Sequence, residues 1–310
     1  MSDPTPKRMT KRNRFMRNSE LTILSLPGVL YTLLFAYLPM IGIVIAFQDY
    51  RVDQGFLHSA WVGLDNFRFF FVTDYAWRII RNTIGYNLTY MIINTTFALI
   101  FALLLNEIGK FFVKIYQTVL FLPYFLSSVL VSYITYAFLE HKHGYLNQFL
   151  LSIGMDPHKW YLESAPWIAI LPTVALWQGV GFGTLIYYAG ILGINHDYYE
   201  AARLDGANRF QMMTKITLPL LTPLIMILFI MGIGNIIRGD FGLHFFIPNN
   251  STFTYSSTDI IDTYVYRALR QLGDVSMSAA TGVLQSVVGL VMVVSANYLV
   301  RRFNEDNSLF

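Results

Sequence analysis

One short stretch of the chain, residues 196–219, gathers charged, small and apolar side chains at spacings that suit docking against a partner. Asp197 and Glu200 are three residues apart, as in a capping box, so we expect a helix that begins near Tyr198. Gly206 follows, where a backbone with positive φ can reverse the chain without strain. The stretch is therefore predicted to form a helix, a tight turn and a second helix.

The predicted first helix presents one nearly flat face. At helical spacing this face holds Tyr198, Ala201, Ala202 and Asp205. The two alanines allow another surface to approach closely, and a helix with such a face usually docks into a groove. In the second helix, Phe210 and Met213 share a face one turn apart. A helix lying on lipid is the alternative, but two methyl groups would anchor it poorly.

The composition of the rest of the chain indicates a membrane. Of 310 residues, 55% are hydrophobic and only 13% are charged, whereas a soluble domain of this length needs far more charge. Six apolar runs without Asp, Glu, Lys, Arg or His are each long enough to cross a hydrocarbon core of roughly 30 Å. They lie near residues 24–47, 84–105, 115–139, 166–192, 216–237 and 278–300. We therefore predict an all-α integral membrane protein with six transmembrane helices.

The distribution of positive charge predicts which side each connection faces. The segment before the first run holds six basic residues, Lys7, Arg8, Lys11, Arg12, Arg14 and Arg17. By the positive-inside rule, both termini are expected in the cytoplasm, together with residues 196–219. The longer connections 48–83, 140–165 and 238–277 then face outward. Lipid binding by the basic segment is the alternative to a role as a topology signal.

These assignments divide the chain into a cytoplasmic basic tail at 1–23, a transmembrane domain at 24–300 and a cytoplasmic tail at 301–310. The first run is too long for a cleaved signal peptide and lacks a small-residue cleavage site, so we expect it to be retained. The chain has no cysteine, which excludes a disulfide framework. The formal net charge of +3 requires no nucleic-acid partner.

The stretch from 200 to 219 resembles a known motif. Seven positions carry the resemblance: Glu200, Ala201, Ala202, Gly206, Ile216, Leu218 and Pro219. In type and spacing they resemble the EAA motif of permease subunits of binding-protein-dependent ABC importers, and "DGA" resembles the sugar-importer branch of that family. The stretches "NTIGYNL", "FLPYF" and "LWQGVGFGTLIYYAGILGI" extend the resemblance over nearly the whole chain. The C-terminal part is similar to the LplB-like and alginate-importer subgroup.

The resemblance implies a type I ABC importer permease fold with a cytoplasmic coupling helix in a bacterial plasma (inner) membrane. Such a permease works with a homologous second permease, two P-loop ATPase subunits and an extracytoplasmic binding protein, surrounded by membrane lipid. The implied cargo is an oligosaccharide, including polysaccharide-derived chains such as alginate oligomers. The implied ATPase-coupling residues are Glu200, Ala201, Ala202, Leu204, Asp205, Gly206, Ile216, Leu218 and Pro219.

The chain is not expected to be an enzyme or to bind a cofactor of its own. Gly109 and Lys110 come nearest to a P-loop, but no Ser or Thr follows them and no glycine lies five residues before Gly109. ATP and Mg²⁺ are therefore expected on a partner ATPase.

Polar and aromatic groups within the apolar runs are candidates for a substrate path, because sugars bind to aromatic faces, amides and hydroxyls in mostly apolar cavities. The candidates are Tyr124, Ser128, Gln178, Gly179, Phe182 and Asn235. We expect the first two to share a face of the third helix, and the next three to share a face of the fourth. Helix–helix packing explains any one of them equally well. Weaker candidates are Tyr86, Asn87, Tyr90 and Asn94.

The outward connections allow fewer conclusions. His141 and His143 would need a third ligand to hold a metal, and none is nearby in sequence, so no metal is expected. Residues 145–162 carry apolar side chains at helical spacing, which predicts a short outward helix. The connection 238–277 is either a solvated loop or a contact for the binding protein. It holds Asp240, Asp259 and Asp262.

An ion-coupled secondary transporter of small polar solutes is the alternative function. Such transporters use buried carboxylates, histidines or broken-helix ion sites, and they show internal repeats. The six runs hold no ionisable group other than tyrosine, and the two halves show no repeat. Both observations argue against this alternative.

Overall fold

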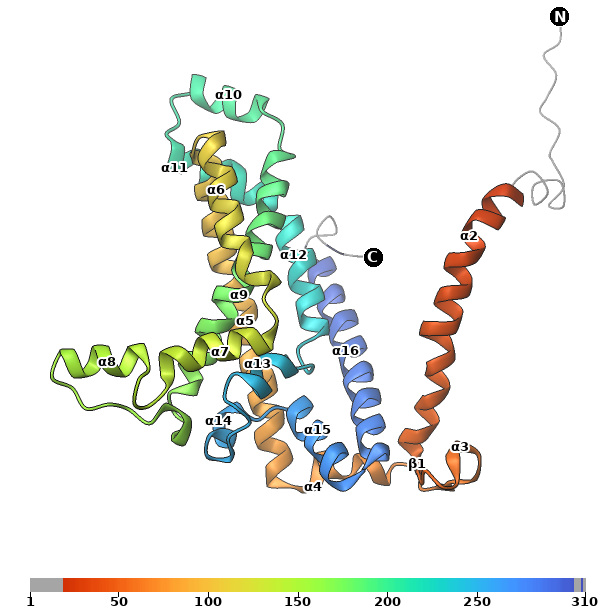
Figure 1. The fold of residues 1–310 in the computed structure, drawn as a ribbon. Helices are drawn as coiled ribbons and strands as arrows, with labels where there is room; N and C mark the ends of the chain where they lie inside the picture. The colour runs from red at the N-terminus through yellow and green to blue at the C-terminus, as the bar shows by residue number, and fades with distance from the viewer. Residues whose placement is uncertain (1–18, 304–307, 309–310) are drawn as a thin grey trace, which may run out of the picture.

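The computed structural model describes residues 19–303 and 308, and helices dominate this part of the chain (Figure 1). Within it, five helical stretches are long and apolar enough to cross a membrane, or six if one bent pair counts as a single span. The stretches are Thr22–Phe47, Asp74–Glu107, Trp167–Leu192, Arg209–Gly234 and Val275–Arg302, and the bent pair is Phe111–Phe125 with Ser128–Leu139. The predicted all-α membrane architecture is confirmed. The six basic residues before the first run lie outside the described residues.

The prediction of one straight helix over 115–139 is wrong. The segment consists of α6 (Lys110–Phe121), η4 (Leu122–Phe125) and α7 (Ser128–Leu139). Its two halves are bent by 100°. Pro123 cannot donate a backbone hydrogen bond, and the Ser127 hydroxyl accepts one from the backbone N–H of Leu130 at 3.3 Å. This cap starts a new helix in a new direction.

The second membrane helix, α5 (Asp74–Glu107), is longer than the apolar run that predicted it, because Thr73 caps its first turn well before that run. Its 34 residues span about 51 Å, which exceeds a hydrocarbon core of roughly 30 Å. The fourth helix, α9 (Trp167–Leu192), packs along it. A methyl group at Gly183 would lie 2.9 Å from Cβ of Ala98, so glycine permits this close approach.

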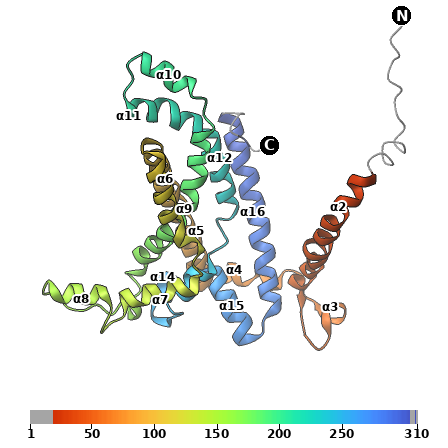
Figure 2. The ribbon, with the colours of Figure 1, turned by 45° about the horizontal axis from the view of Figure 1, so that its top comes forward.

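The first membrane helix stands apart from the other helices for most of its length (Figures 1 and 2). It consists of α2 (Ser19–Thr32), the π-helix η1 (Leu33–Tyr37) and the 3₁₀-helix η2 (Leu38–Phe47). Only its last part packs against α16 (Val275–Phe303), where Ala46 is fully buried. The earlier residues expose apolar side chains, which in a membrane face lipid or another subunit.

The fifth membrane helix packs against α16. It consists of α11 (Arg209–Met212), the π-helix η6 (Met213–Thr217) and α12 (Leu218–Gly234). A methyl group at Gly289 of α16 would lie 2.5 Å from the carbonyl oxygen of Gly234. The two helices therefore meet at a glycine, which allows their backbones to touch.

Small elements connect the membrane helices at the end of the molecule opposite α10 (Asp197–Leu204) (Figure 1). They are β1 (Gln48–Asp49), α3 (Gly55–His58), β2 (Ala60–Trp61), η3 (Asp65–Phe67), α4 (Phe69–Val72), α8 (Tyr145–Ser152) and η5 (Trp160–Leu162). The two strands are antiparallel, with Gln48 opposite Trp61 and Asp49 opposite Ala60. The short helix predicted within 145–162 is confirmed as α8.

The connection 238–277 is folded rather than a solvated loop. Its helices are α13 (Phe241–Phe246), η7 (Thr252–Thr254), α14 (Tyr255–Thr258) and α15 (Ile261–Leu272). The Asp259 side chain is 0% exposed and pairs with Arg267 at 2.6 Å. Its carboxylate also accepts hydrogen bonds from the hydroxyls of Tyr75 and Thr263. These partners compensate for the burial of the charge and tie this connection to α5.

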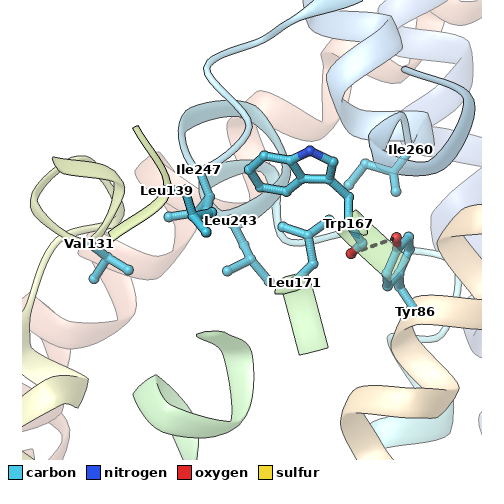
Figure 3. Packing of buried hydrophobic residues seen from close by; sticks show 8 residues of the cluster. All are labelled: Tyr86, Val131, Leu139, Trp167, Leu171, Leu243, Ile247 and Ile260. Atoms are coloured by element: carbon cyan, nitrogen blue, oxygen red, sulfur yellow. Dashed lines mark hydrogen bonds between the residues drawn. The ribbon is translucent and has the colours of Figure 1, made fainter. Parts of the chain in front are cut away.

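A buried cluster beside α13 fixes that short helix in place (Figure 3). Its members are Tyr86, Val131, Leu139, Trp167, Leu171, Leu243, Ile247 and Ile260. They come from α5, α7, α9, α13, the residue after α13 and the residue before α15. The Tyr86 hydroxyl donates a hydrogen bond to the carbonyl oxygen of Trp167 at 3.4 Å. The cluster therefore holds α13 against the middle of the α5–α9 pair.

Candidate coupling surface and substrate cavity

The short helix α10 (Asp197–Leu204) and the turn after it project from one end of the helix bundle (Figures 1 and 2). Leu204 is 90% exposed and Phe210 is 71% exposed, although both side chains are large and apolar. Of the other predicted coupling residues, those exposed are Glu200, Ala201, Asp205, Gly206, Leu218 and Pro219, and those half-buried are Ala202 and Ile216. This projecting surface, the coupling arch (residues 196–217), has the exposure that a docking surface requires.

The turn of the arch has the predicted backbone conformation. Gly206 has a φ of +79°, and nothing lies within 4 Å of a Cβ added there. The glycine is therefore needed for its backbone angle and not for close packing. The backbone N–H of Ala207 donates to the carbonyl oxygen of Ala202 at 2.9 Å, which closes the turn.

The helix starts of the arch are capped differently from the prediction. Helix α10 begins at Asp197, one residue before the expected position, but no capping box forms there. Instead, the side chain of Asn195 accepts a hydrogen bond from the Asp197 backbone N–H at 3.1 Å. The capping box lies at the second helix, where Asn208 and Gln211 bond reciprocally at 2.9 and 2.8 Å. A side-chain N-cap therefore forms only at the second of these two helices, where asparagine provides it.

The second helix of the arch continues into the fifth membrane helix through a π-helical segment. Thr217, which is buried within that segment, lies 2.8 Å from the Tyr199 hydroxyl of α10. Such π-segments are frequent at functional sites, because they leave carbonyl groups without their usual helical partner. Helix α10 is thus joined to the first part of the fifth membrane helix by a continuous backbone and by one partly buried hydrogen bond.

A second link joins the arch to α5. The Arg209 guanidinium lies 3.3 Å from the Glu107 carboxylate at the last residue of α5. Between the arch and the ends of α5 and α9 lies an open polar cavity of about 880 Å³. Because both charged groups are partly exposed, the pair contributes orientation more than stability.

A second cavity, of about 390 Å³, lies beside the middle of α5 and brings together three of the predicted substrate residues. Its lining consists of Asn87, Tyr90, Asn94, Tyr124, Ala175, Gln178, Gly179, Asp240 and Leu243. Tyr124, Gln178 and Gly179 were primary candidates. Asn87, Tyr90 and Asn94 were weaker ones, although their spacing of three and four residues already indicated one helix face. We call this space the central cavity.

Three predicted substrate residues lie outside this lining. Ser128 packs against α13, where a methyl group at Gly242 would clash with its hydroxyl. It does not share a helix face with Tyr124, because the bend separates the two helices. Phe182 stacks on the Tyr124 ring with centroids 4.8 Å apart, so it supports a cavity wall from behind. Asn235 is exposed at the end of α12 and donates to the carbonyl oxygen of Met231.

Sequence reasoning missed the role of α13. Asp240 lines the central cavity and caps α13 by accepting a hydrogen bond from Leu243 N–H at 2.9 Å. His244, in the same connection between membrane helices, lies 2.9 Å from the Tyr90 hydroxyl and 2.8 Å from the carbonyl oxygen of Thr258. Burial lowers the pKa of His244 to about 4. The Asp-x-x-x-His spacing, at 240 and 244, was the available signal.

The outward histidines make ordinary loop contacts. His141 Nδ1 lies 3.3 Å from the carbonyl oxygen of His158, and the backbone N–H of His143 donates to Glu140. Two backbone N–H groups bind the Glu140 carboxylate and hold its pKa below the ordinary value. Across residues 19–303 and 308, His, Asp and Glu form no group of three or more placed to hold a metal ion.

Comparison with protein families identifies a match over most of the chain. The family model described as "Binding-protein-dependent transport system inner membrane component" matches residues 94–305. Among curated proteins, the chain is 36% identical to Protein LplB of Bacillus subtilis (strain 168), covering 94% of this chain and 91% of that protein. It is 35% identical to the polygalacturonan/rhamnogalacturonan transport system permease protein YteP of the same organism, with the same coverage.

Solved structures give the same result. The chain is similar to a subunit of a bacterial ABC transporter involved in the import of the acidic polysaccharide alginate, with a TM-score of 0.84 and 32% identity. The match covers 94% of this chain and 98% of that one. A second structure of a bacterial alginate ABC transporter, in complex with an alginate pentasaccharide-bound periplasmic protein, matches with the same TM-score.

Proposed function

The chain belongs to the family of binding-protein-dependent transport system inner membrane components, and from this we propose that it conducts an oligosaccharide through an ATP-driven importer. It is a multi-pass permease of the inner membrane that works with partner subunits and a binding protein. YteP belongs to a polygalacturonan/rhamnogalacturonan transport system and the matched solved transporter imports the polysaccharide alginate, which supports an oligosaccharide as cargo. The family assignment favours this function over an ion-coupled secondary transporter.

The coupling arch carries the proposal. The large apolar side chains of Leu204 and Phe210 remain exposed on either side of a turn formed by Gly206, which has a positive φ. Such a surface is costly in water unless a partner covers it. We assign the arch to a groove on a P-loop ATPase, with one ATPase for each of two permeases. ATP and Mg²⁺ are bound by those ATPases, and this chain supplies the docking surface.

The arrangement of the helices supports a cytoplasmic position for both ends. The arch and the C-terminal end of α16 lie toward the same end of the molecule (Figure 2). That end carries Arg203, Arg209, Lys215, Arg301 and Arg302. Positive charge is retained on the cytoplasmic side of inner-membrane proteins. We propose cytoplasmic tails at 1–23 and 301–310, with the transmembrane domain over 24–300.

Purification from the native host tests this function. The tagged chain is isolated in a mild detergent, and the proteins that accompany it are identified by mass spectrometry. We expect a second permease with its own EAA motif and a P-loop ATPase, and ATP hydrolysis that increases when the loaded binding protein is added. A folded chain that purifies without either partner would overturn the proposal.

A further inference from the structure

The amides around the central cavity have fixed orientations. The Asn87 side chain donates both of its N–H groups, to the carbonyl oxygens of Ile236 at 2.9 Å and Arg238 at 2.8 Å. Backbone carbonyl groups only accept hydrogen bonds, so the Asn87 oxygen is left to the cavity. Gln178 donates one N–H to the carbonyl oxygen of Leu126 at 2.9 Å, which leaves its oxygen and one N–H. Both amides therefore present an acceptor to a ligand.

The Tyr90 hydroxyl also presents a hydrogen-bond acceptor to the cavity. The carbonyl oxygen of Thr258 only accepts, so the proton of the neutral His244 ring must be on Nδ1. Its Nε2 then accepts a hydrogen bond from the Tyr90 hydroxyl at 2.9 Å. Because the single hydroxyl proton is used in this bond, the Tyr90 oxygen offers only lone pairs to the cavity.

Asp240 adds a further acceptor. The side-chain oxygen of Asn94 is buried against Gly179, 3.2 Å from a Cβ added there, and has no hydrogen-bond partner, so it is not counted among the acceptors open to a ligand. Asp240 uses one carboxylate oxygen as the cap of α13 and retains the other. The nearby Arg238 does not line the cavity, and its guanidinium donates to the hydroxyl of Ser286 at 3.0 Å. The lining therefore has one negative charge, a surplus of acceptors and no cation.

We propose that the central cavity binds a neutral sugar unit through its hydroxyl groups and excludes a uronate carboxylate. This inference rests on the proposed oligosaccharide function and specifies the chemistry of the cargo at this point. Sugar hydroxyls donate to the free acceptors, and the Tyr124 ring offers an apolar face to a pyranose. A carboxylate can only accept hydrogen bonds, and it would face the like charge of the exposed Asp240 side chain at the protein surface. A volume of about 390 Å³ suits a small ligand.

A matched pair of sugars tests the proposal directly. The complete complex of both permeases and ATPases is placed in nanodiscs without the binding protein, because that protein has its own specificity. The probes are tetragalacturonate and the neutral tetragalactose obtained from it by carboxyl reduction, and binding is followed by saturation-transfer difference NMR. We expect the neutral probe to bind at least about tenfold more tightly, because two like charges about 4 Å apart near a protein surface repel by roughly 4 kcal/mol.

Two variants and a control assign the preference to the cavity. Asp240→Asn keeps a capping oxygen but removes the charge. The uronate should therefore bind more tightly to this variant than to the wild type, with an affinity within about threefold of that of the neutral probe. Asn94→Leu keeps the volume but removes a polar amide from the lining, so the neutral probe should bind about threefold to tenfold more weakly. Asp53→Asn makes the same charge change at an exposed loop position and should alter neither probe.

The outcomes separate this inference from the function on which it rests. Equal or tighter binding of the uronate to the wild-type complex would overturn the inference, as would an Asp240→Asn variant with unchanged selectivity. Binding of neither probe, or binding that depends on an added cation such as Na⁺, would also overturn it. If stimulated ATP hydrolysis persists in these cases, the importer function still holds. A complex that lacks stimulated hydrolysis with any cargo would instead refute the function.

Discussion

Replacement of Gly206 by alanine tests the coupling arch at one backbone angle. The residue has a φ of +79°, which alanine adopts at a cost of roughly 1–2 kcal/mol. Nothing lies within 4 Å of an added Cβ, so the substitution causes no steric clash and the strained backbone conformation accounts for the entire expected free-energy cost. A cost of this size shifts a local equilibrium by a factor of about 5–30. We expect stimulated ATP hydrolysis by the assembled complex to fall by a similar factor.

The assay measures ATP hydrolysis by the reconstituted complex with and without the loaded binding protein, together with the amount of ATPase that copurifies. Gly206→Asn should retain more stimulation than Gly206→Ala, because asparagine tolerates the left-handed conformation better. Gly154→Ala is the matched control, since Gly154 has a φ of +82° and equally open surroundings in the turn after α8. It imposes the same strain outside the arch and should leave stimulation intact.

Full stimulation in Gly206→Ala would refute a requirement for this turn geometry. Equal damage by asparagine and alanine would show that any side chain is harmful, and would assign the effect to contact with the partner instead. Loss of stimulation in the Gly154→Ala control would show that strain at any exposed turn disturbs the complex.

Three further predictions follow from the buried groups and the cavity. Arg267→Met leaves Asp259 buried without its cation, so thermal unfolding of the purified complex should occur earlier, by a loss of about 3–5 kcal/mol; an unchanged transition would contradict this. The pKa of His244 is lowered from 6.5 to about 4, so between these pH values the unfolded chain binds more protons than the folded chain. The free energy of unfolding should therefore decrease as the pH is lowered from 6.5 to 4, by about 3 kcal/mol in total; His244→Gln should flatten this part of the pH profile of thermal unfolding. Tyr124→Ala should weaken neutral-sugar binding in nanodiscs more than Asn235→Ala does, because only Tyr124 lines the cavity; equal effects would indicate general packing.

Local sequence features predicted the parts of the molecule that local physics controls. Long apolar runs without charge identified the membrane helices, because burial in lipid demands them. Charge, small residues and a glycine between two runs identified the arch, and the positive φ of Gly206 is confirmed. The bend after Pro123 was missed, because membrane helices often contain proline without breaking. The deciding feature was the cap at Ser127.

The central cavity required contacts that no short stretch of sequence specifies. Asn87, Tyr90 and Asn94 lie on one face of α5, but a packing role explained that face equally well until α13 was placed beside it. Burial of Asp259 was similarly unpredictable, because its partners Tyr75 and Arg267 lie 184 and 8 residues away. From the sequence, a solvated loop and a contact for the binding protein were equally good expectations for this connection.

Helix α5 is one continuous helix, so a tilt at one of its ends displaces the other end. It has no proline in its 34 residues, and it is attached at both ends, to Asp259 through Tyr75 and to Arg209 through Glu107. Over a length of about 51 Å, a tilt of about 5° about one end moves the other by about 4 Å. A displacement of that size is about one van der Waals contact distance between carbon atoms, roughly 3.5–4.0 Å. A small rotation of the arch is therefore geometrically sufficient to make or break side-chain contacts at the other end of α5.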